Sequence, residues 1–150
     1  MAKFVYRMQN ILNIKQKLET QVKMTYSVAN QKYLEQQKIL QEYMVRRVGY
    51  EQHWKKLMQG NLNLQEVEHA RADVNAMKTI VRRQMVEVHK AEKELEDARN
   101  RLKTVMQERK VQEKLREKAF EEFKQELAEA ETKEIDELVS YTYNKGEQGE

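Results

Sequence analysis

Apolar residues recur every seven positions through the middle of the chain, which is typical of a coiled coil. The first series consists of Val67, Val74, Val81, Val88, Leu95 and Leu102. A second series, offset by three positions, consists of Ala70, Met77, Gln84, Ala91, Ala98 and Val105, and only Gln84 in it is polar. The residues around both series are mostly charged residues or glutamines, so the apolar stripe is narrower than that of a helix on a globular core. The spacing therefore predicts a helix that packs along a coiled-coil seam.

Helical spacing also extends to both sides of this segment. Apolar residues at intervals of three and four predict a first helix over about residues 3–59, and Gly60 can end it. Asn63 is a candidate N-cap with Glu66 three residues later, so we expect a turn at about 60–63 and a second helix over about 64–141. The glycine-containing tail 143–150 has no apolar period and is expected to be disordered. These boundaries predict one coiled-coil hairpin domain over residues 1–142.

A single short turn requires the two helices to lie antiparallel. The fold class predicted is therefore all-α, an antiparallel two-helix coiled-coil hairpin with a longer C-terminal helix. Residue i of the first helix should lie near residue 122 − i, which places Asn10 and Asn13 at the level of Gln112 and Arg109 as a polar layer. The second helix should extend beyond the end of the first, so we expect residues 119–138 to project without an intramolecular partner. An exposed apolar row of this kind usually marks a protein partner.

Composition limits the class of protein. Charged residues make up 35% of the chain and the mean hydropathy is -0.97, which leaves little apolar matter for a thick core. The absence of proline favours continuous helix, and the absence of cysteine excludes disulfides and suits a reducing cytosol. No apolar run approaches the roughly 20 residues of a membrane span, and the start lacks a signal-peptide core. We expect a soluble, intracellular protein.

Charge is distributed unevenly along the chain. Residues 1–60 hold 11 Lys/Arg against 4 Asp/Glu, whereas residues 110–150 hold 7 against 12. A nucleic-acid binder would use the basic residues Lys3, Arg7, Lys15, Lys17, Lys23, Arg46 and Arg47. However, the acidic last third would repel the same phosphates, while a hairpin would bring the basic and acidic ends together. The distribution therefore favours intramolecular pairing over nucleic-acid binding.

Residues suited to catalysis are few and scattered. Glu66 and His69 have the spacing of a helix-bundle metal motif, but such a site needs a second copy and further carboxylates. No glycine-rich phosphate loop occurs, and neither Ser27 nor Ser140 adjoins a histidine and an acid. We predict no enzymatic activity, no catalytic residues, no cofactor and no metal site.

Both ends of the chain resemble a known family. The segment from Phe4 to Lys15 has an aromatic-x-aromatic-Arg-apolar-Gln opening followed by paired apolar residues, and it resembles the start of the flagellar export protein FliJ. Residues 113–118 and 131–138 are similar to the C-terminal helix of that family, with its Asp-Glu ending. Residues 30–60 offer no segment that can be matched position by position.

This resemblance implies a function and partners. FliJ-like proteins are antiparallel coiled coils, similar to the central stalk of rotary ATPases, in the flagellar type III export apparatus. They insert the end with both chain termini into the hexameric export ATPase, promote its assembly and link it to the membrane export gate. They are also described as chaperone escorts. The protein would then lie in the cytoplasm at the inner face of the cell membrane, at the flagellar base.

Two sets of residues are candidates for these contacts. Those for the ATPase are Phe4, Tyr6, Arg7, Phe120, Phe123, Leu127, Ile135 and Leu138. Those for the export gate are Tyr43, Tyr50 and Trp54, since large aromatic residues dominate interface energetics. The alternative for these three is packing within the hairpin. A self-associating structural coiled coil, or an adaptor unrelated to export, remains an alternative function, with a nucleic-acid-binding coiled coil as a further one.

Overall fold

The computed structural model describes residues 2–148, with the side chains of residues 2–146. It contains two helices, α1 (Gln9–Leu57) and α2 (Leu64–Gln148), and no strand occurs among these residues. The helices pack against each other as a hairpin, which confirms the predicted fold class. The chain divides into two compact units: the turn unit, Thr20–Thr104, and the termini unit, Met1–Glu19 with Val105–Glu150. Both helices contribute residues to each unit.

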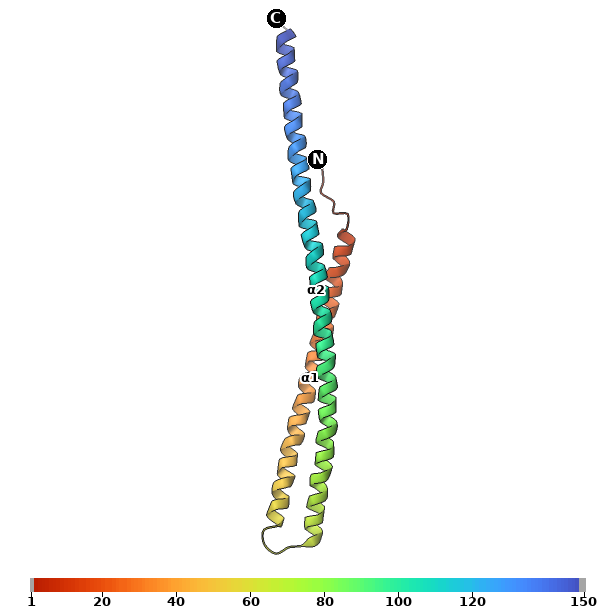
Figure 1. The fold of residues 1–150 in the computed structure, drawn as a ribbon, viewed down its shortest axis with the longest axis vertical. Coiled ribbons are helices and arrows are strands. Elements are labelled where there is room, and N and C mark those ends of the chain that lie inside the picture. Colours follow the sequence, from red (N-terminus) through yellow and green to blue (C-terminus); the bar gives the residue numbers. More distant parts are fainter. Residues whose placement is uncertain (1, 149–150) are drawn as a thin grey trace. The chain divides into compact units, whose positions relative to one another are not determined.

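The heptad positions of α2 form the packed face of the turn unit, where α1 and α2 run side by side in opposite directions (Figure 1). Every position of both series from Val67 to Leu102 is buried or half-buried. Val74 and Val81 are only 2% and 1% exposed, and Ala70 and Ala91 are also buried. Small side chains let two helix backbones approach closely, so the seam predicted from the spacing is confirmed.

Gln84 is the polar position of this seam, and α1 satisfies it. Its Nε2 donates hydrogen bonds to the backbone oxygen of Gln36 at 2.9 Å and to Gln36 Oε1 at 2.7 Å. Nearby, Lys32 Nζ lies 3.2 Å from Glu94 Oε2. Both pairs lie within about one helical turn of the predicted register. A satisfied polar pair in an apolar seam favours one register over its neighbours.

The turn between the helices follows the local chemistry of its residues. Gly60 has φ 118°, a left-handed conformation that disfavours residues with a Cβ. Asn63 Oδ1 accepts a hydrogen bond from the Gln65 amide at 3.1 Å, and its backbone oxygen accepts one from the Val67 amide at 3.0 Å. This is the geometry expected of an N-cap.

The structure differs from the sequence prediction at both chain ends. α1 begins at Gln9 rather than near residue 3, and residues 2–8, here called the N-terminal segment, are not helical. Their contacts with α2, given below, replace a further turn of helix. α2 continues to Gln148, so residues 143–148 are helical and not a disordered tail, while 149–150 lie outside the described residues. Backbone hydrogen bonds within a helix need no tertiary partner, and no proline interrupts this stretch.

Candidate partner-binding surfaces

An ion pair occupies the packed side of the termini unit. Arg109 pairs through Nε with Oε2 of the buried Glu19. The heptad spacing predicts an apolar residue at position 109. Arg109 Nη1 donates to Glu113 Oε1 at 2.8 Å. The hydrogen bond to Glu113 and the charges of Glu19 and Glu113 raise the pKa of Arg109 above its ordinary value, although burial acts in the other direction. Arg109 is therefore a permanent cation that the seam matches with carboxylates.

Glu19 was not singled out from the sequence as the partner of Arg109. A signal was present, because Glu19 is the only acidic residue before Glu35 and Arg109 required an anion opposite it. A second pair flanks this one on the surface, with Lys15 Nζ 2.7 Å from Glu108 Oε2.

Tyr6 and Gln9 make further polar contacts in this unit. Tyr6 is 9% exposed, and its hydroxyl donates to Gln112 Oε1 at 3.1 Å. Arg116 Nε donates to Gln9 Oε1 at 2.9 Å. The predicted layer of Asn10 and Asn13 against Gln112 and Arg109 is wrong in its partners, since Tyr6 and Glu19 hold these positions. Asn13 instead accepts a hydrogen bond from Gln9 Nε2 at 3.0 Å.

Three phenylalanines form a cluster where the N-terminal segment meets α2. The Phe4 ring lies 5.0 Å from that of Phe120, edge to face, and 5.5 Å from that of Phe123. Arg116 lies over the Phe4 ring, with Cζ 5.6 Å from the centroid, and Lys124 over the Phe120 ring, with Nζ at 4.6 Å. The prediction that Phe120 and Phe123 project without an intramolecular partner is therefore wrong. Non-helical chain reaches farther per residue than helix, so seven residues suffice to cover both rings.

Beyond this cluster α2 continues as a C-terminal arm, defined here as residues 124–146. The blue end of α2 lies beyond the N-terminal segment (Figure 1), and every side chain of the arm is exposed. Its exposed large hydrophobic residues are Leu127, Ile135, Leu138, Val139, Tyr141 and Tyr143. Ile135 is 60% exposed and Leu138 65%. Three of the ATPase candidates lie in the arm: Leu127, Ile135 and Leu138. Four others make contacts within the chain: Phe4, Tyr6, Phe120 and Phe123. The last candidate, Arg7, is exposed on the surface.

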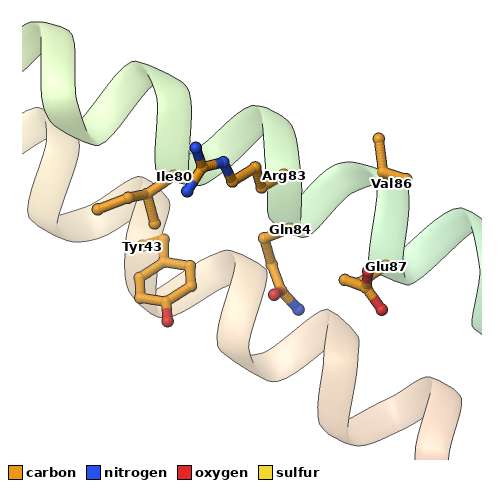
Figure 2. Close-up of a pocket in the computed structure, with 6 residues that line it drawn as sticks. All are labelled: Tyr43, Ile80, Arg83, Gln84, Val86 and Glu87. Carbon is orange, nitrogen blue, oxygen red and sulfur yellow. The ribbon is translucent and has the colours of Figure 1, made fainter.

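The three gate candidates lie on α1 in the turn unit. Tyr43 is half-buried and lines an open hollow of about 420 Å³, whose other walls are the α2 residues Ile80, Arg83, Gln84, Val86 and Glu87. Figure 2 shows the Tyr43 ring on α1 and the Gln84 side chain pointing toward that helix. Tyr50 is exposed, whereas Trp54 is half-buried with its Nε1 buried. Hairpin packing therefore buries part of the Tyr43 and Trp54 side chains, and Tyr50 is the most exposed of the three.

Over the part of the chain that the structure describes, neither helix contains a stretch that is long and apolar enough to cross a membrane. Within residues 2–148, no group of three or more His, Asp or Glu side chains is arranged to hold a metal ion.

A helical hairpin packed along a heptad seam, with an exposed C-terminal arm, defines the class of two-helix coiled-coil proteins. The family model described as "Flagellar FliJ protein" matches residues 4–148, nearly the whole chain, and the chain belongs to the FliJ family. It is therefore a protein related to flagellar export, in a family of non-catalytic export components. Comparison with curated proteins gave no match, and neither did comparison with solved structures.

Proposed function

We propose that the protein is a stalk of the flagellar type III export apparatus that inserts its C-terminal arm into the export ATPase ring. In this role the protein promotes ring assembly and couples the ring to the membrane export gate. It acts in the cytoplasm, peripheral to the membrane at the flagellar base. Export chaperones are further candidate partners. The proposal rests on membership in the FliJ family together with the surfaces described above.

The observation that carries the proposal is the exposed arm. Monomeric soluble proteins rarely leave a row of large apolar side chains uncovered, and such a row usually marks a protein interface. The arm presents Leu127, Ile135 and Leu138 on a helix with all its side chains in solvent. A bare helix is also narrow, about 10–12 Å across with its side chains, which suits insertion between subunits of a ring.

The gate contact is assigned to Tyr50, with Tyr43 and Trp54 beside it on α1. Tyr50 combines an exposed ring with a position one turn before Trp54. Aromatic residues are enriched at the energetic centres of interfaces, which supports this assignment.

Truncation after Phe123 tests the ATPase role directly. The full chain should stimulate hydrolysis by the purified cognate export ATPase and increase the hexamer fraction in sedimentation. The truncated chain should lose both effects, because it lacks the apolar arm but keeps the contacts of the N-terminal segment. A Tyr50→Ala chain serves as the matched control and should keep full stimulation while losing gate binding. Equal stimulation by the full and truncated chains would contradict the proposal.

A further inference from the structure

The packed face of the termini unit continues along the arm after its intramolecular partner ends. On this face, α2 residues three or eight positions apart, about one or two helical turns, meet residues of the chain's first 19 positions: Arg109 meets Glu19, Gln112 meets Tyr6, and Phe120 and Phe123 meet Phe4. Steps of three or four residues past Phe123 fall on Leu127, Glu131, Glu134, Leu138 and Tyr141. The arm thus continues the α2 face that, up to Phe123, packs against the first 19 residues of the chain.

That continuation holds two carboxylates, Glu131 and Glu134, and only Glu131 has a large apolar residue one turn away on both sides. Glu131 lies one turn after Leu127 and one turn before Ile135, so its carboxylate interrupts the apolar stripe. Within the described residues, Glu131 forms no ion pair, and the neighbouring Lys124 pairs with Glu121 at 3.6 Å. A carboxylate at the centre of an interface loses its hydration when the stripe is covered, and this is costly unless a cation faces it.

The partnered half of the same face shows how such a position is satisfied. Arg109 also interrupts the apolar spacing, and the opposing segment supplies Glu19 to it. By the same physical rule, Glu131 requires a cation from whatever covers the arm. The arm of a second copy is a poor source, since residues 124–146 hold six acidic residues against three lysines.

We propose that the arm is covered by a partner surface that is apolar opposite Leu127 and Leu138 and offers a lysine or arginine to Glu131. Glu131 is thus the residue of the arm that determines partner specificity. This inference rests on the proposed function and names the chemistry of the surface in the ATPase ring that the arm contacts. Register along that surface follows from the same pair, because sliding the arm by one turn would leave the carboxylate against apolar side chains.

Charge reversal at Glu131 tests the inference, with reversal at Glu129 as the matched control. The two residues are both exposed glutamates of the same helix, but two positions correspond to about 200° of rotation, so Glu129 lies on the other face. Binding of the Glu131→Lys, Glu129→Lys, truncated and unchanged chains to the purified cognate export ATPase would be measured at low and high salt. Circular dichroism of each variant checks that the helix content is unchanged.

Glu131→Lys should weaken binding about 30-fold, as expected when a buried charge pair becomes a clash, and the loss should persist at high salt. Glu129→Lys should stay within about twofold, because its position faces solvent. Equal losses in both variants that vanish at high salt would overturn the inference in favour of general attraction to an acidic arm. A normal Glu131→Lys chain together with an inactive truncated chain would overturn it while leaving the proposed function intact.

Two other outcomes are also decisive. If truncation itself leaves ATPase binding unchanged, the proposed function fails and this assignment of the partner fails with it. If the full chain sediments as a dimer that truncation converts to a monomer, a second copy covers the stripe and the inference is wrong.

Discussion

The turn unit and the termini unit use α2 in different ways. In the turn unit, valines and alanines close the seam, with Val74 and Val81 almost fully buried and Gln84 satisfied by Gln36. In the termini unit, the face of α2 meets an ion pair, a tyrosine hydrogen bond and a phenylalanine cluster, and then continues uncovered as the arm. Small apolar contacts give permanent packing, whereas polar and aromatic contacts leave an interface that a partner can extend.

This difference follows from what fills each seam. Short side chains allow close helix approach and gain stability from area removed from water. Charged seam positions gain little net stability, because desolvation offsets their attraction, but they discriminate strongly between partners. The turn unit is therefore expected to hold the fold and the termini unit to select the partner.

The largest effect on stability is expected in the turn-unit seam. Val81→Ala should lower the free energy of unfolding by about 2 kcal/mol, because it removes buried methyl groups and leaves a cavity. Urea denaturation followed by helical circular dichroism would measure the loss. Val45→Ala is the control, since Val45 is 72% exposed on α1, and it should change stability by less than about 0.5 kcal/mol. Similar losses in both variants would mean that the heptad seam does not dominate stability.

A smaller and local effect is expected at the phenylalanine cluster. Phe4→Ala should lower the local opening free energy by about 1 kcal/mol, because two ring contacts are lost. Hydrogen exchange of the amides of residues 117–124 should speed up about fivefold, while exchange in the turn unit stays the same.

The matched control for Phe4→Ala is Val5→Ala, whose side chain is 79% exposed and should alter neither region. Unchanged exchange in the Phe4→Ala chain would show that the N-terminal segment does not hold Phe120 and Phe123 in solution.

The smallest effects are expected at the ion pairs. Glu19→Gln should speed amide exchange around Arg109 less than Phe4→Ala does at its own site, because Arg109 keeps the hydrogen bond to Glu113. Glu94→Gln should cost less than about 0.5 kcal/mol, since the Lys32–Glu94 pair is about half exposed on both sides. Hydrogen exchange resolved by peptide would compare the two variants. A larger effect from Glu94→Gln would reverse the assigned roles of the two pairs.

Much of the fold could be predicted because its signals are local. The heptads at Val74 and Val81, the left-handed Gly60 and the Asn63 cap each depend on residues within one or two turns. The pairing of Gln36 with Gln84 lies close to the predicted register, because one short turn leaves little freedom in alignment. The prediction that apolar residues of the second helix are left uncovered is confirmed at Leu127, Ile135 and Leu138.

The candidate site was less predictable where distant residues meet. The spacing did not indicate that Phe4 would leave the helix to cover Phe120 and Phe123. The contrast between Tyr50 and Trp54 likewise depends on how α1 packs, since both have the same aromatic character and lie one turn apart.

The sequence by itself determined the two helices, the turn between them, the seam and the apolar residues of the arm, because each arises from periodicity or capping within a few residues. Only the tertiary structure decided that Glu19 neutralises Arg109 and that Phe4 packs against Phe120 and Phe123. These choices depend on the balance among several weak contacts between residues about one hundred positions apart. No local propensity encodes that balance.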